Sequence, residues 1–156
     1  MSKPVNVHGT GLVLGEIGVL LRGPSGAGKS VLALSLLDRY NDRGEHSFLI
    51  SDDRVDLSTD IDIVIMQAPP QLGGLVELRG RGIVRRPHQT SSRLHLVIDL
   101  VEDFARMLEE EAFSTQLLGI TLARAPVPRA GIIGLGHQML LVREAIAALH
   151  RPAALP

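Results

Sequence analysis

The sequence predicts an α/β fold in which a mixed β-sheet packs against helices. Short runs rich in aliphatic and β-branched residues recur along the chain, as expected of strands. Two longer apolar segments, residues 30–40 and 138–150, have the length of helices. A glycine-rich stretch separates a strand-like run from the first of these segments. The order of strand, loop and helix is typical of βαβ proteins.

Length and composition limit the possible organisation and partners. A chain of 156 residues has the size of one compact domain, so we predict a single domain over residues 1–156. The formal net charge of −1 provides no global attraction to nucleic acid or anionic lipid. The absence of Cys excludes disulfides and thiolate metal sites. No apolar run approaches the length of a signal peptide or a membrane span, so we expect a cytoplasmic protein. Together with the net charge, this predicts neither nucleic-acid nor membrane partners.

The first third of the chain contains strands and the first helix. Residues 5–22 consist of short β-prone pieces separated by glycines, which predicts hairpin strands leading into the glycine-rich loop. Residues 30–40, "SVLALSLLDRY", are apolar on several faces and predict a buried helix. Gly44 in the following "NDRG" is the expected C-terminal cap of this helix.

The remainder alternates strands with two further helices. We expect strands at residues 46–50, 60–68, 94–100 and 115–127. Residues 75–88 predict a strand followed by a mobile, arginine-rich loop, and residues 102–113 predict a short helix. The apolar segment 138–150 predicts a C-terminal helix that either closes the core or forms an interface.

The glycine-rich loop matches the phosphate-binding motif G-x-x-x-x-G-K-[ST] without a mismatch. Its residues are Gly23, Pro24, Ser25, Gly26, Ala27, Gly28, Lys29 and Ser30. Glycines at these positions let backbone N–H groups surround an anion at a helix N-terminus. Lys29 would reach the β- and γ-phosphates of a nucleotide, and the Ser30 hydroxyl would bind Mg²⁺. The motif does not identify a reaction, because switches, motors, kinases and transporters share it.

Acidic residues near the ends of strands could complete such a site. Asp52 and Asp53 end one strand, and side-chain alternation predicts that one of them faces the phosphates without saying which. The alternative is that this pair caps the strand and contacts Arg54. Asp99 could serve the site or have a structural role at the end of its strand. From spacing alone, Glu77 is a solvated strand residue and His8 a surface residue.

Several segments, taken together and in order, resemble the catalytic domain of bacterial HPr kinase/phosphorylase. They are "HGTGLVL", "GPSGAGKS", "SDDRVDL", "APPQLGGLVELRGRGI" and, more loosely, "FARM", which together extend from His8 to about Arg106. The resemblance implies a P-loop kinase-like fold of the phosphoenolpyruvate-carboxykinase-like variant. It also implies an enzyme that transfers phosphate from ATP, with Mg²⁺, to a serine of the phosphocarrier protein HPr. In this family the same site can also run the reverse phosphorolysis.

The resemblance also implies roles for individual residues. Asp53 matches the acceptor of the serine proton, and Asp52 lies beside it to orient groups or water. Glu77 matches the acid that joins Ser30 at Mg²⁺. The remaining matches are His8 as an active-site histidine, Lys29 as the catalytic lysine of the phosphate loop and Arg106 as an active-site arginine.

Some features depart from the family pattern. Full-length relatives have an additional N-terminal domain, so a short form is expected here. The segment "APVPRAGIIG" replaces the family's "PV-R-x-GR", which weakens the case for phosphorolysis. Arg81, Arg85 and Arg86 either contact the protein substrate or form a solvated basic loop. The family forms hexamers, so a homo-oligomer is expected.

Two other functions remain open from the sequence. One is a small-molecule kinase or carboxykinase-like P-loop enzyme, and the other is a nucleotide sensor that transfers nothing. A pure sensor would not need His8, Asp52, Asp53 and Glu77 together, so these four residues favour an enzyme.

Overall fold

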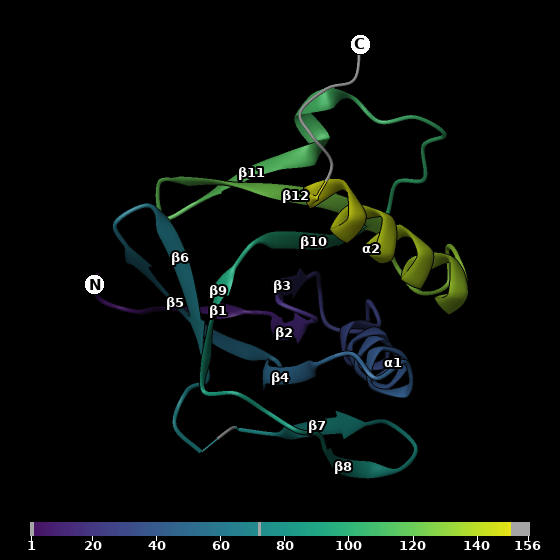
Figure 1. Cartoon of the computed structure of the whole chain (residues 1–156). Helices are drawn as coiled ribbons and strands as arrows, with labels where there is room; N and C mark the ends of the chain where they lie inside the picture. Colours follow the sequence, from purple (N-terminus) through teal and green to yellow (C-terminus); the bar gives the residue numbers. More distant parts are fainter. Residues whose placement is uncertain (1, 72, 151–156) are drawn as a thin grey trace.

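A six-stranded mixed sheet runs through the middle of the molecule, with helices on one face and a smaller sheet on the other (Figure 1). The computed structural model describes residues 2–71 and 73–150. Met1, Leu72 and residues 151–156, which belong to the predicted domain 1–156, lie outside the described residues. The strands, in spatial order, are β11 (Ser114–Leu117), β12 (Ile120–Pro128), β10 (Leu96–Val101), β3 (Ile17–Arg22), β2 (Thr10–Leu14) and β4 (Ser47–Ser51).

The sheet combines both strand directions, as predicted. β10 lies parallel to β3 and to β12, whereas the β2–β3, β2–β4 and β11–β12 pairs are antiparallel. Parallel strands need a long crossover connection, and helix α1 (Lys29–Asp42) lies in the connection between β3 and β10. The phosphate loop is therefore located where β3 ends and α1 begins.

Side chains alternate between the two faces of the sheet and build two cores. Leu12, Leu21 and Ile98 belong to the core shared with α1 and α2 (Leu135–Leu149). Leu20 and Val97, each next in sequence to one of these, belong to the core shared with the second sheet. Because neighbouring strand residues point in opposite directions, both faces must be covered, which makes these strands apolar throughout.

The second sheet has the order β1 (Val5–His8), β5 (Arg54–Asp60), β6 (Ile63–Gln67) and β9 (Ser91–Leu94), and all its pairs are antiparallel. β5 was not among the predicted strands, because charged residues interrupt "RVDLSTD". Its Val55 and Leu57 alternate inward and are almost fully buried, at 0% and 1% exposure. β5 matters for the site because it begins directly after Asp52 and Asp53.

Three predicted elements differ in the structure. The predicted mobile loop after residue 78 instead forms a second strand, β8 (Gly82–Arg85), which pairs with β7 (Leu75–Leu78) because Val84 and Val76 meet and pack on the helix-side core. The predicted single strand 115–127 is a hairpin of β11 and β12, turned at Leu118 and Gly119 with φ of 52° and 80°.

The prediction of a helix at residues 102–113 is wrong. Only the 3₁₀ helix η1 (Glu110–Phe113) forms there. Four of the segment's large apolar side chains are exposed, so no buried face stabilises a longer helix. They are Phe104, Met107, Leu108 and Phe113.

The two α-helices agree with expectation. α1 ends at Asp42, and Gly44, with φ of 73°, donates its N–H to Asn41, which confirms its role at the C-terminus. α2 packs one face on the core through Met139, Val142 and Ile146, so it closes the core, while Leu140 stays exposed. In the described part of the chain, no helix is both long and apolar enough to cross a membrane.

Candidate active site

A cavity of about 390 Å³ opens at the N-terminus of α1. Nine of its lining residues were singled out from the sequence. Five of them belong to the phosphate-binding motif, and β1, the β4–β5 bend and β7 supply the other four. The lining residues are His8, Ser25, Gly26, Gly28, Lys29, Ser30, Val31, Asp52, Asp53, Glu77 and Arg79. Sheet topology therefore brings the phosphate loop and the predicted acids to one place.

The phosphate loop wraps around the start of α1 with glycines at its tightest points. Gly26 and Gly28 have φ of 85° and 95°, a region that side-chain-bearing residues seldom adopt. The Ala27 N–H donates to the carbonyl of Pro24, which closes the loop on itself. The unpaired N–H groups of the first helical turn, which carry partial positive charge, add to the loop's own amides. This arrangement suits an anion.

Lys29 is almost buried, with 8% exposure, and its ammonium group lies inside the loop. Nζ donates to the carbonyls of Gly23 at 2.6 Å and Pro24 at 3.1 Å. Burial lowers the pKa of Lys29, and the charges of Asp53 and Asp52 partly oppose that shift. A cation removed from water is a strong partner for a phosphate.

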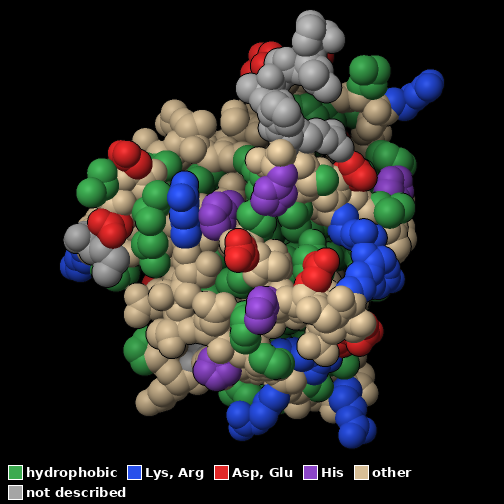
Figure 2. Space-filling model, viewed as in Figure 1, with side chains coloured by type: hydrophobic (Ala, Val, Ile, Leu, Met, Phe, Trp, Pro, Cys, Tyr) green, Lys and Arg blue, Asp and Glu red, His purple; other side chains and the backbone are tan. Residues whose placement is uncertain are grey.

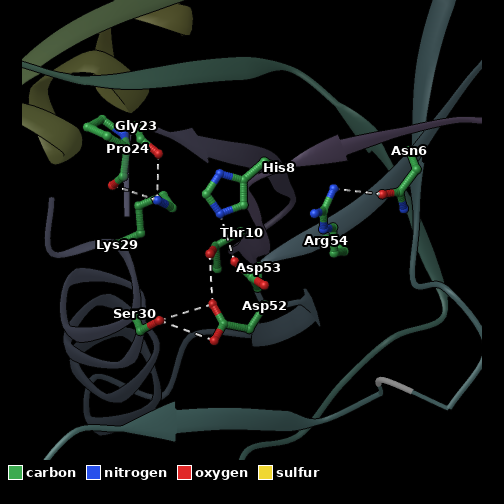
Figure 3. A network of polar contacts seen from close by, with 10 residues as sticks. All are labelled: Asn6, His8, Thr10, Gly23, Pro24, Lys29, Ser30, Asp52, Asp53 and Arg54. Atoms are coloured by element: carbon green, nitrogen blue, oxygen red, sulfur yellow. Dashed lines mark hydrogen bonds and ion pairs between the residues drawn. The ribbon is translucent and has the colours of Figure 1, made fainter. Parts of the chain in front are cut away.

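Asp52 connects the loop to the sheet (Figure 3). Its Oδ1 accepts a hydrogen bond from Thr10 Oγ1 at 2.8 Å, and both its carboxylate oxygens lie within reach of Ser30 Oγ, at 3.2 and 3.1 Å. Thr10 is fully buried, so the Asp52 carboxylate is fixed by a hydrogen bond to a residue of the protein interior. Thr10 was missed in the sequence analysis, and its position two residues after His8 was the available signal.

Asp53 lies in a backbone bend, which the alternation of side chains along a strand did not predict. Its φ of 70° is left-handed, and Gly9 N–H donates to its carbonyl at 3.0 Å. Asp tolerates this conformation better than most residues. The bend lets Asp52 and Asp53 both line the cavity. Arg54 instead donates to Asn6 Oδ1 at 3.4 Å.

His8 lies against Asp53, and both residues line the cavity (Figure 3). Its Nε2 is 2.7 Å from Asp53 Oδ1, within hydrogen-bonding distance. The β1–β5 register explains this contact, because His8 is opposite Arg54, the residue that follows Asp53. The carboxylate remains 70% exposed and is accessible to an incoming group.

Glu77 and Arg79 extend the cavity at the end of β7. Glu77 is exposed and lines the cavity together with Ser30. Arg79 lines the same cavity and was missed, although the spacing of two residues from Glu77 predicts a shared face. Arg106 lies in the exposed segment between β10 and η1, outside the residues that line the cavity.

Asp99 has a structural role, which resolves one open alternative. Arg22 binds it through two hydrogen bonds of 2.7 and 2.9 Å, and Arg124 donates from Nε at 2.5 Å. Burial would raise the pKa of Asp99, but the hydrogen bonds and charges of Arg22 and Arg124 outweigh it and hold the pKa below its ordinary value. Because Arg22 directly precedes Gly23, this ion pair fixes the start of the phosphate loop.

The residues at the cavity fit a nucleoside triphosphate with Mg²⁺. Loop amides, a buried lysine and a helix N-terminus favour phosphates, while Ser30, Asp52 and Glu77 offer oxygen ligands. Within residues 2–71 and 73–150, no three His, Asp or Glu side chains cluster closely enough to hold a metal ion alone. Mg²⁺ is commonly bound by one or two protein oxygens together with nucleotide phosphates.

A strand, a glycine-rich loop closed by Lys-Ser and a helix, with acids on neighbouring strands, define the phosphate-loop class of nucleotide-binding proteins. Within that class, residues 1–151 match the family model "HPr Serine kinase C-terminal domain". The chain belongs to this family.

Comparisons with individual proteins agree. An HPr kinase/phosphorylase of Neisseria meningitidis is 34% identical over 152 residues, which cover 88% of this chain and 44% of the relative. One from Geobacillus thermodenitrificans is 35% identical over 145 residues, covering 82% and 43%. The chain thus spans less than half the length of these relatives.

A solved structure also agrees in fold. The HPr(Ser) kinase/phosphatase from Coxiella burnetii superimposes with a TM-score of 0.74 at 26% identity, covering 94% of this chain and 99% of the other. This likeness confirms the predicted α/β, P-loop kinase-like fold.

Proposed function

We propose that this chain is an ATP-dependent protein-serine kinase whose acceptor is the phosphocarrier protein HPr. The observation that carries the proposal is the pairing of His8 with an exposed Asp53 across the cavity from the phosphate loop. A protein that merely held a nucleotide would need the loop without a carboxylate aimed at an acceptor. Family membership supports the choice of HPr among possible acceptors.

Each group at the cavity has a chemical task in this proposal. The loop amides and Lys29 bind the phosphates of ATP and spread their negative charge. Mg²⁺, when bound, would neutralise further charge on the phosphates, and Ser30 and Glu77 are the residues that would hold it. Asp53 takes the proton from the acceptor serine, and His8 orients that carboxylate. Asp52, fixed by Thr10, holds the Ser30 hydroxyl in place.

The kinase direction is the one we propose. Arg129, the cation in "APVPRAGIIG", donates from Nε to Glu102 at 2.6 Å and is not one of the residues lining the cavity. Its guanidinium is therefore engaged in another contact. This favours transfer to serine over phosphorolysis at this site.

The hairpin of β7 and β8 supplies the surface next to the cavity. Figure 2 shows Lys and Arg side chains along the lower edge of the molecule, where Figure 1 draws this hairpin. Arg86 makes a two-bond ion pair with Asp38 of α1, at 2.8 and 3.0 Å, so its role is to attach the hairpin. Arg81 and Arg85 are exposed, and we propose that they contact the acceptor protein.

We propose further that the chain forms a homo-oligomer, as the family resemblance implies. Exposed apolar side chains on α2 and in the segment between β10 and η1 support this, among them Leu140 at 59% and Met107 at 88% exposure. A mass measurement in solution tests it, and a monomer at every concentration would refute it.

The function is tested by incubating the chain with labelled ATP, Mg²⁺ and purified HPr. Label on a serine of HPr is expected. Label on small metabolites in a cell extract, with none on HPr, would favour a small-molecule kinase. Nucleotide binding without any transfer would favour a sensor.

A further inference from the structure

The turn that leads from the end of β12 to α2, residues 128–133, contacts the phosphate loop through Ala130, which does not line the cavity. The Ala130 N–H donates to the carbonyl of Ala27 at 3.2 Å. A Cβ built on Gly28 would lie 2.9 Å from the Cβ of Ala130, so the two backbones are packed closely. Gly28 lines the cavity, whereas neither Ala27 nor Ala130 is among the lining residues.

This contact controls a peptide plane that matters for anion binding. In a trans peptide the C=O and the following N–H point in opposite directions. Because Ala130 holds the Ala27 carbonyl, the Gly28 N–H is directed away from Ala130, and Gly28 itself lines the cavity. The left-handed Gly28, with φ of 95°, would otherwise be free to rotate that peptide.

The 128–133 turn is itself held by a buried side chain. Gln138, in the first turns of α2, is 2% exposed and donates from Nε2 to the carbonyl of Pro128 at 3.0 Å. The Arg129 N–H donates to Val101 at 2.9 Å, which continues the β10–β12 pairing into the turn. A buried side-chain amide destabilises the protein unless it forms a hydrogen bond. The bond to the Pro128 carbonyl therefore fixes Gln138 and the turn relative to each other.

We propose that Gln138 is a positioning residue for nucleotide binding, acting through the 128–133 turn on the Ala27–Gly28 peptide. It touches neither nucleotide nor acceptor. It sets the direction of one amide in the phosphate loop, so its loss weakens the binding of phosphates while the loop sequence stays intact. The inference rests on the proposed nucleotide site but not on the identity of the acceptor.

The central variant is Gln138→Met, which keeps length and helix propensity and removes the donor. We expect the dissociation constant for ADP with Mg²⁺ to rise about three- to tenfold, the equivalent of one hydrogen bond. Hydrogen exchange of the free protein should be faster at residues 128–133. Ala130→Pro removes the N–H itself and should weaken the binding of ADP to a similar extent. Ala130→Gly keeps the N–H and should not weaken it.

A control separates positioning from general stability. Ile146, on the same helix, is buried in the core away from the turn, so Ile146→Val or Ile146→Ala can be chosen to match the loss of melting temperature. The matched variant should bind ADP as the unsubstituted chain does. Equal weakening in both, or an unchanged dissociation constant in Gln138→Met with faster exchange at the turn, would overturn the proposal.

The two proposals fail in different ways. A chain that binds ADP but never phosphorylates HPr refutes the kinase assignment, and a Gln138→Met effect on ADP would still support positioning. A chain that binds no ADP refutes both.

Discussion

His8 Nε2 lies 2.7 Å from Asp53 Oδ1, although 45 residues separate the two in sequence. The contact depends on the antiparallel pairing of β1 with β5 and on the left-handed bend at Asp53. It gives an exposed carboxylate a fixed direction beside the phosphate loop.

Asp53→Asn should reduce phosphate transfer to HPr by at least about 100-fold, because it removes the proton acceptor while keeping the shape. The dissociation constant for ATP should change by no more than a few-fold. Transfer assays and calorimetry measure the two effects separately. Asp56→Asn, a matched change on β5 outside the cavity lining, should leave both unchanged. Full activity in Asp53→Asn would remove Asp53 from the role of base.

His8→Gln should lower transfer less than Asp53→Asn, because His8 acts by orienting the carboxylate. In the double variant the His8 substitution should add little further loss, since residues that act as one unit are not additive. A double-mutant cycle on kcat measures this coupling. Fully additive losses would mean that His8 acts independently of Asp53.

Asp99→Asn should lower the free energy of unfolding by about 2 kcal/mol, because two arginines lose a charged acceptor that is partly screened by solvent. The folded pKa of Asp99 is depressed, so its contribution is complete above the unfolded value of about 3.9 and is lost as the pH falls below it. Urea unfolding measures both effects. Asp38→Asn, which breaks the more exposed pair with Arg86, should cost about 0–1 kcal/mol. Equal costs would contradict the assigned role of Asp99.

His95 should make stability sensitive to mild acid. Its Nδ1 accepts a hydrogen bond from Gly18 N–H at 2.9 Å, which requires that nitrogen to be unprotonated. Burial, with the charges of Arg93 and His150, lowers the pKa of His95. The stabilisation is therefore complete above the unfolded value of about 6.5 and declines as the pH falls through and below it.

His95→Asn keeps an acceptor that does not titrate in this range, so stability measured by urea unfolding should change less between pH 7 and 5. His46→Asn, at an exposed histidine, should keep the original pH dependence. An unchanged profile in His95→Asn would reject this role.

Arg81→Ala combined with Arg85→Ala should raise the KM for HPr several-fold and leave the KM for ATP near its original value. Both side chains are exposed on the hairpin beside the cavity. Arg86→Ala provides the comparison, because that guanidinium is paired with Asp38. If Arg86→Ala raises the KM for HPr as much as the double variant, the contact surface is wrongly assigned.

The elements predicted well are those whose signals are local in sequence. The phosphate loop follows from the spacing of Gly23, Gly28, Lys29 and Ser30, and the sheet from runs of alternating or continuous apolar residues. Both patterns can be recognised within a short stretch of sequence, although the strands then pair with distant partners. The end of α1, which Gly44 follows, was predicted from the same kind of signal.

The features that were missed depend on partners far away in the chain. The bend at Asp53 requires a hydrogen bond from Gly9, so alternation within one strand could not show that both acids reach the cavity. Strand β8 forms because Val84 pairs with Val76 and packs against the helix-side core. The role of Asp99 required Arg22 and Arg124 on two neighbouring strands. The contribution of Thr10 likewise appears when β2 and β4 are paired.

The most direct test of the proposed kinase activity is the mass of HPr after incubation with this chain, ATP and Mg²⁺, followed by mapping of the modified residue. We expect the gain of one phosphoryl group on a serine, absent when Asp53→Asn replaces the unsubstituted chain. Unmodified HPr, under conditions where the chain demonstrably binds ATP, would contradict it.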